Sequence, residues 1–212
     1  RILQLYTQFN SRRKPEMLSA DTYSLDHYGE ADRIVAQYDS IYREAKRIYQ
    51  VIPADARAAF YQLVLFPVAA CDNLNRLCVA TARNHLSASE GRATTNLMAD
   101  NARSLFIRDS LLSYYYNKVM EHGRWNHMMD QTHIGYSYWQ EPRYNRMPPL
   151  DRITLPDSAL MGVALSGTDA WWPAASRPAF LPRFNSWQKH PYQIIVFSRG
   201  RKPVSYSLHT DQ

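Results

Sequence analysis

The prolines of this 212-residue chain divide it into two parts. Three of the twelve prolines lie before Glu141 and nine lie after it. Proline removes a backbone hydrogen-bond donor and breaks the interior of a helix. Long helices are therefore excluded from the part that follows Glu141, whereas the part before it can be helical.

Apolar side chains in the first part recur at the spacing of long amphipathic helices. Residues 28–49 place apolar groups three and four positions apart, which predicts a helix of about six turns. A second helix is expected over 55–88, with a kink at Pro67, and a third over 92–122. Three long helices joined by short links predict an antiparallel bundle.

The second part has the pattern of short strands. The best candidates are 161–165, 192–197 and 204–208, and a hairpin turn is expected around Gly200 between the last two. Two or three strands do not make a stable sheet domain alone. We therefore expect the chain to be an excerpt of a longer protein.

Charge and hydropathy bear on the partners. From residue 142 onward there are 9 basic and 4 acidic residues, which accounts for most of the net charge of +6. A nucleic-acid-binding stripe is denser in basic residues, so we expect no nucleic-acid partner. The longest apolar run, 63–71, includes Pro67 and is far shorter than the roughly 20 residues of a membrane helix, so no membrane partner is expected.

Two smaller features have structural interpretations. Cys71 and Cys78 lie about 10 Å apart along one predicted helix, which is too far for a disulfide and indicates buried free thiols. The run Arg12 to Lys14 before Pro15 is typical of a solvated turn, and an anion site is the alternative. The chain has no nucleotide-binding or nucleophile signature, and no cofactor is expected.

The segment 124–142, RWNHMMDQTHIGYSYWQEP, mixes aromatic and polar side chains. Aromatic rings cover the C–H face of a pyranose while amides, imidazoles and carboxylates bind its hydroxyls. The alternative is a hydrogen-bonded loop that joins two domains. A metal site is not expected, because the two histidines at the centre of the segment are not at helical ligand spacing and have no cysteine support. The candidate substrate-binding or cleft-facing residues are Trp125, His127, Asp130, His133, Tyr136 and Trp139.

The sequence GRWNHMMDQTHIGYSYWQEP at 123–142, followed by NRMP at 145–148, resembles the hallmark stretch of glycoside hydrolase family 115, the xylan α-1,2-glucuronidases. Residues 12–33, 59–75 and 171–208 also resemble stretches of that family. The resemblance implies a mixed α and β fold, an antiparallel α-helical bundle followed by a partial β-sandwich. The implied regions are the α-helical bundle 1–122, the hallmark loop and proline-rich connection 123–151, and an incomplete C-terminal β-sandwich 152–212.

The resemblance also implies a function for the longer protein, which is the removal of glucuronic acid or its 4-O-methyl ether from xylan by inverting hydrolysis. Such hydrolysis needs an acid and a base about 6.5–9.5 Å apart. The family's catalytic carboxylates lie in a barrel domain upstream of Arg1, so we expect no catalytic residue in this chain and no activity from it alone. The hallmark loop is expected to face the cleft of the intact enzyme.

The partners implied are glucuronoxylan or its oligosaccharides, the upstream barrel domain, and a second copy in a homodimer. A polysaccharide substrate suggests a secreted or periplasmic protein. The alternative function is a non-catalytic carbohydrate-binding or dimerisation module. An intact acidic pair in the upstream barrel would favour the enzyme, and its absence would favour the module.

Overall fold

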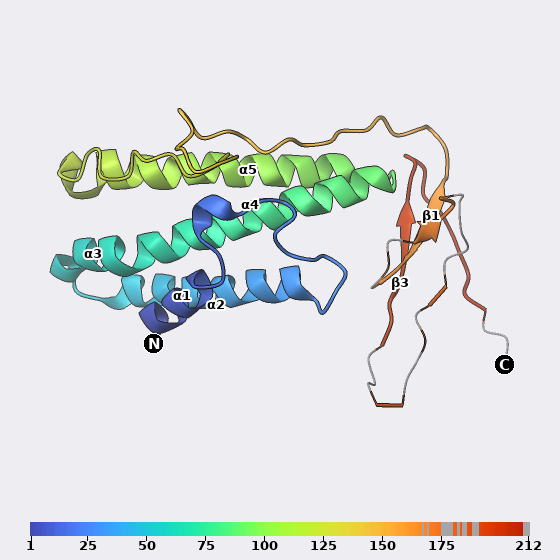
Figure 1. Ribbon diagram of the computed structural model, residues 1–212, viewed down its shortest axis with the longest axis horizontal. Coiled ribbons are helices and arrows are strands. Elements are labelled where there is room, and N and C mark those ends of the chain that lie inside the picture. The colour runs from blue at the N-terminus through green and yellow to red at the C-terminus, as the bar shows by residue number, and fades with distance from the viewer. Residues whose placement is uncertain are drawn as a thin grey trace.

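The structure is a computed structural model with helices along most of its length and a small sheet at one end (Figure 1). It describes residues 1–166, 168, 170–174, 180, 181, 183, 186, 187 and 191–209. The mixed α and β fold class predicted from the sequence is confirmed, with a helical body followed by a partial sheet. The stretch 171–208 that resembles the family's β-sandwich lies partly outside the described residues.

Each of the three long predicted helices is present. They correspond to α2 (Glu30–Val51), to α3 (Ala54–Phe60) continuing into α4 (Phe66–Ser89), and to α5 (Thr95–Tyr114). A π-helical segment, Tyr61–Leu65, separates α3 from α4. Pro67 follows it in the first turn of α4, and the helical stretch continues from Ala54 to Ser89 with a local change of hydrogen-bond pattern near the proline. The kink expected at Pro67 stays a prediction.

Two short helical elements are not predicted by the sequence pattern, the helix α1 (Ile2–Asn10) and a 3₁₀ turn at Pro15–Met17. The helix predicted over 92–122 is α-helical only as far as Tyr114, and continues as a π-helical segment, Tyr115–Val119, and a 3₁₀ turn, Met120–Gly123.

Helix α1 has Phe9 as its one buried residue. Ile2, Leu5 and Tyr6 pack with Phe9 on the core cluster that includes Ile34 of α2, at the spacing of a helix face. The sequence carries this short period, so α1 was predictable from it.

Helix α4 is the central helix of the body. It packs against α2 on one side and α5 on the other (Figure 1). Among the described residues, the helical stretch Ala54–Ser89 is long and apolar enough to cross a bilayer, but 72% of its most apolar window is buried within the protein, as in a core helix. Cys71 and Cys78 are free and buried, as predicted. Burial raises the pKa of both thiols, that of Cys78 to about 12.

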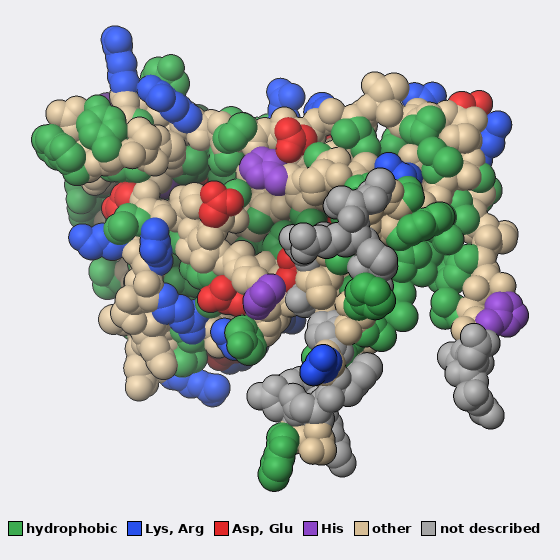
Figure 2. Space-filling model, turned by 45° about the vertical axis from the view of Figure 1, so that its right-hand side comes forward, with side chains coloured by type: hydrophobic (Ala, Val, Ile, Leu, Met, Phe, Trp, Pro, Cys, Tyr) green, Lys and Arg blue, Asp and Glu red, His purple; other side chains and the backbone are tan. Residues whose placement is uncertain are grey.

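The sheet has three antiparallel strands in the order β2, β1, β3. Strand β1 (Met161–Leu165) has the predicted bounds, and β3 (Ile194–Ser198) overlaps the predicted strand 192–197. Strand β2 (Trp171–Trp172) is not predicted by the pattern. Apolar side chains gather on the surface over this end of the molecule (Figure 2).

The predicted hairpin and the strand at 204–208 are wrong. After Ser198 the backbone bonds to the segment that precedes β1, and the chain bends at 200–202 without forming a second strand. The amide of Arg199 donates to the Leu160 carbonyl at 2.8 Å, and that of Arg201 donates to the Pro156 carbonyl at 3.0 Å. Residues 204–208 are not part of the sheet, and no strand among the described residues lies beside them.

The sheet is fixed to the carboxyl end of α4. The Arg92 guanidinium lies 4.5 Å from the centre of the Phe197 ring, and that of Arg199 lies 4.9 Å from the Trp171 ring. Arg199 also donates from Nε to the Glu90 carbonyl at 3.0 Å. Stacked guanidinium groups with a hydrogen bond to the helix end hold the two parts together.

The connection 143–160 has no helix or strand and runs along the helices to β1 (Figure 1). Asparagine side chains bind its backbone, and we call these contacts asparagine clamps. Asn84 donates to the Asp151 carbonyl at 2.9 Å and accepts from its amide at 2.7 Å. Asn96 makes the same pair of bonds to Ile153, at 3.0 and 3.1 Å.

Asn84 is fully buried and also donates to the Thr95 carbonyl at 3.0 Å. We expect Asn84→Ala to lower the free energy of unfolding by about 3 kcal/mol, because it leaves peptide groups of the connection without a partner. Asn101→Ala, at an exposed position on α5, is the matched control and should change it by less than about 0.5 kcal/mol. Urea denaturation measures both, and equal effects would contradict the role given to the clamp.

Candidate functional site

The hallmark loop, residues 124–142, follows the end of the helical body and divides into two halves. Residues 124–134, the anchored half, are hydrogen-bonded to the helices and pack on their cores. Residues 135–142, the exposed half, reach the surface. The two halves differ in what their side chains can do, so they are described in turn.

Asn117 holds the first turn of the anchored half. It lies in the π-helical segment Tyr115–Val119 and is 6% exposed. Its Oδ1 accepts the Met129 amide at 2.9 Å, and its Nδ2 donates to Oδ1 of Asp130 at 2.7 Å. The other carboxylate oxygen of Asp130 accepts from His127 Nδ1 at 2.5 Å. A π-helical turn re-aims a side chain relative to an α-helix, and here the segment carries the asparagine that fixes the loop.

His133 binds the loop to α5. Its Nε2 lies 2.9 and 3.0 Å from the two carboxylate oxygens of Asp109, and its Nδ1 lies 3.1 Å from the Gln131 carbonyl oxygen. Burial lowers the pKa of His133, but the hydrogen bond and charge of Asp109 and the bond to Gln131 outweigh it. The net result is a raised pKa.

The side chain of Asn145 binds the backbone of the loop where the anchored half ends. Asn145 Oδ1 accepts the amides of His133 at 2.8 Å and Ile134 at 2.9 Å, and the Arg146 amide donates to the Ile134 carbonyl at 3.1 Å. The Ile134 side chain is buried against Leu74 and its neighbours. The exposed half therefore starts from a fixed point.

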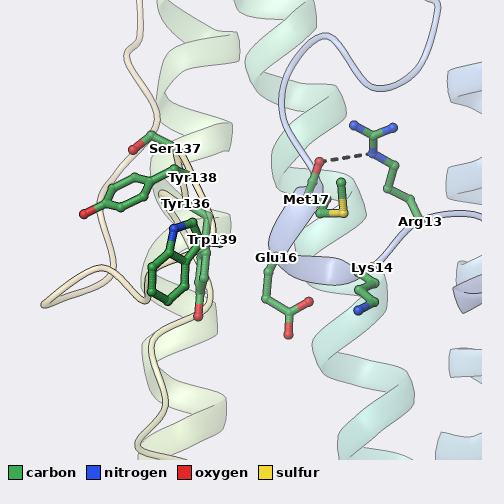
Figure 3. A pocket seen from close by; sticks show the side chains of 8 residues that line it. All are labelled: Arg13, Lys14, Glu16, Met17, Tyr136, Ser137, Tyr138 and Trp139. Carbon is green, nitrogen blue, oxygen red and sulfur yellow. Dashed lines mark hydrogen bonds between the residues drawn. The ribbon is translucent and has the colours of Figure 1, made fainter.

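The exposed half and the N-terminal segment 13–17 face each other across a hollow of about 640 Å³, which we call the loop groove (Figure 3). Its lining residues are Arg13, Lys14, Glu16, Met17, Tyr136, Ser137, Tyr138 and Trp139. Tyr138 points away from the N-terminal wall (Figure 3) and donates to Gln140 at 2.8 Å. Trp139 is 85% exposed.

The N-terminal wall of the groove is itself held in place. Arg13 Nε donates to the Met17 carbonyl at 3.3 Å (Figure 3), which closes a short turn at the groove. Downstream, the Tyr23 hydroxyl donates to Asn75 on α4 at 2.9 Å. Both walls are thus tied to the same helical body.

The lining of the loop groove has more positive than negative side chains. Within the described part of the chain neither Arg13 nor Lys14 forms an ion pair, and Glu16 is the one carboxylate in the lining. Two cations and an exposed indole that line one groove can bind an anionic ligand that also has an apolar face. In the described ranges no group of three histidine, cysteine or carboxylate side chains could hold a metal ion.

The candidate residues are thus distributed over three surroundings. Tyr136 and Trp139 line the loop groove. Trp125 packs on the core cluster around Tyr116. The remaining candidates are hydrogen-bonded within the protein, as described above for His127, Asp130 and His133.

The N-terminal wall is absent from the candidates predicted from the sequence. The available signal was the basic run before Pro15, for which a solvated turn was the favoured interpretation. Its first residue does have a structural contact, because Arg12 donates to Gln37 at 2.6 Å. Arg13 and Lys14 instead line the groove.

No protein-family model matches this chain, and no curated protein matches it.

Gly135 is the first residue of the exposed half, and its backbone has a positive φ. Its φ is +96°, and a Cβ there would lie 2.9 Å from Arg146 Cβ. We expect Gly135→Ala to lower the free energy of unfolding by about 2–3 kcal/mol. Gly29→Ala is the control, because Gly29 has φ +57° but no atom within 4 Å of its Cβ position. Gly29→Ala should lower the free energy of unfolding by about 1 kcal/mol. Thermal denaturation measures both variants, and equal losses of stability would contradict the close approach of Arg146 to Gly135.

Proposed function

We propose that the chain is the helical and C-terminal part of a glycoside hydrolase family 115 xylan α-1,2-glucuronidase, in which the loop groove binds the acidic side chains of glucuronoxylan. The observation that carries the proposal is the groove itself, whose lining includes the cations Arg13 and Lys14 on one wall and the exposed Trp139 on the other. The resemblance of the hallmark loop supplies the identity of the polysaccharide.

The indole of Trp139 supports the sugar-binding part of the proposal. A flat ring that is 85% exposed and borders a groove can cover the C–H face of a pyranose. Tyr136 adds a second ring in the same lining. Neutral xylose units can bind in this way, so the rings alone do not select an acidic sugar.

The N-terminal wall supports selection of a uronic acid. Arg13 uses Nε for the Met17 carbonyl, which leaves its terminal nitrogens for a carboxylate. Lys14 adds a second positive charge. Glu16 can accept hydrogen bonds from sugar hydroxyls, and the half-exposed Met17 offers an apolar contact to a methyl ether.

The acid and base of hydrolysis are proposed to lie in the upstream barrel domain. Inverting hydrolysis needs two carboxyl groups with room for a water molecule between them, and Glu16 is the one carboxylate in the groove lining. The loop carboxylates Asp130 and Glu141 already bind Asn117 and Thr132, at 2.7 and 3.0 Å. The groove therefore fits a binding role.

A second candidate is a non-catalytic carbohydrate-binding module. The same groove favours it, because binding needs no pair of carboxyl groups. The upstream barrel domain and a second copy of the chain, forming a homodimer, are further proposed partners, and export follows if the substrate is a cell-wall polysaccharide.

Calorimetric titration with a glucuronic-acid-substituted xylo-oligosaccharide and with its unsubstituted counterpart tests the binding role. We expect the substituted one to bind more tightly. Trp139→Ala should weaken both by about ten-fold, which corresponds to about 1.4 kcal/mol. Arg13→Gln should weaken only the acidic ligand by a similar factor.

Matched controls are Tyr28→Ala and Arg33→Gln, both at exposed positions away from the groove lining. They should leave both affinities unchanged. Equal binding of the acidic and neutral ligands, or unchanged binding by Trp139→Ala, would contradict the proposal. The chain alone should release no glucuronic acid, and turnover by it would contradict the placement of catalysis in another domain.

A further inference from the structure

His133 stands where the anchored half of the loop meets the exposed half, and both of its ring nitrogens face oxygen acceptors. The carboxylate of Asp109 lies 2.9–3.0 Å from Nε2, and the Gln131 carbonyl oxygen lies 3.1 Å from Nδ1. A neutral imidazole has one N–H and can satisfy one of the two. The arrangement is complete when the ring is protonated.

The Asp109 carboxylate also favours a protonated His133 ring. Asp109 lies on α5, is 3% exposed, and within the described residues has no hydrogen-bond partner besides His133. A buried carboxylate without a compensating charge is strongly disfavoured. Loss of the proton from His133 therefore weakens the contact that binds the loop to α5.

His133 is also continuous with the groove. Its ring borders two hollows of about 400 and 460 Å³ beneath the loop. The first is also lined by Tyr136 and the second by Glu16, and both of these residues line the loop groove as well. The His133 ring therefore lies beside residues of both walls of the groove.

We propose that His133 is a positioning residue whose protonated ring holds the exposed half of the loop in its binding geometry, so that binding of the acidic saccharide weakens as the pH rises. This inference rests on the function proposed for the groove. His133 does not line the groove itself, and acts through Tyr136 and Trp139.

Other titratable and charged groups face the same hollows. They are Glu16 and Asp21 of the N-terminal segment, Arg146 of the loop's returning arm, His85, Cys71 and Cys78 of α4, and the phenols of Tyr6 and Tyr136. His85 is bonded through Nε2 to the Pro149 carbonyl oxygen at 2.9 Å and pairs with no carboxylate of the described residues. Glu16 acts in the same direction as Asp109 and favours the protonated ring.

The sign of the pH dependence follows from the raised pKa of His133. A group whose pKa is higher in the folded state stabilises that state fully at a pH below its unfolded value, here 6.5. The contribution is lost as the pH rises through the folded pKa. The His133 contact should thus be strongest below pH 6.5 and weaken as the pH rises through the raised pKa of His133.

The experiment uses the whole chain and two readouts. Nuclear magnetic resonance follows the His133 ring, identified by its absence from the spectrum of His133→Gln, while hydrogen exchange follows protection of residues 131–141 between pH 5.5 and 9. Calorimetry measures the affinity for the glucuronic-acid-substituted oligosaccharide over the same range. His27→Gln, at an exposed histidine, is the matched control.

We expect a pKa above 6.5 for His133 and an affinity that falls about ten-fold around that pKa. The control should follow the wild type, and His133→Gln should bind weakly at every pH. A pKa at or below 6.5, or a variant that keeps the wild-type pH profile, overturns the inference. If His133→Gln does not fold, Asp109→Asn takes its place, and it should lower the pKa of His133 and shift the affinity profile with it.

The two proposals fail separately. If no saccharide binds at any pH, the function proposed for the groove is wrong, and hydrogen exchange alone decides the role of His133. Protection that falls through the His133 pKa then supports the positioning role. Protection that is independent of pH overturns it.

Discussion

Backbone hydrogen bonding in the stretch between the helices and the sheet governs the structure. The connection 143–160 belongs to no helix or sheet. Its peptide groups therefore need other hydrogen-bond partners. An asparagine side chain donates and accepts at once and therefore matches one peptide group. Asn84 and Asn96 bind the connection in this way, while Asn117 and Asn145 bind the hallmark loop. These contacts fix the paths of the connection and of the loop that carries one wall of the groove.

Helix α2 was predictable because it buries a continuous apolar face, and the period of that face is local information. Helices α4 and α5 were predictable from their length and from the apolar residues spaced along them, although α4 and α5 also bury polar side chains. Strand β1 was predictable for a similar reason. The failure at 204–208 has a physical cause, since a strand needs a neighbour as well as a suitable composition. The neighbour expected from a hairpin is not formed, because the backbone after Ser198 bonds to Pro156 and Leu160 instead.

The site was predictable in composition but not in arrangement. The mixture of rings and polar groups in the hallmark loop does mark it as unusual. Which polar groups are engaged depends on Asn117 and Asp109, which the loop pattern does not contain. The second wall, with Arg13 and Lys14, comes from the other end of the chain. A local pattern cannot indicate such a pairing, because it arises only when both segments pack on α4.

The central claim is that the N-terminal segment and the exposed half of the loop form one binding surface. Chemical-shift mapping with a glucuronic-acid-substituted xylo-oligosaccharide tests it most directly, because it reports each wall separately. The account predicts saturable shifts at Arg13 and Lys14 together with shifts at Tyr136 and Trp139. Shifts confined to one wall, or located on another face of the molecule, would contradict it.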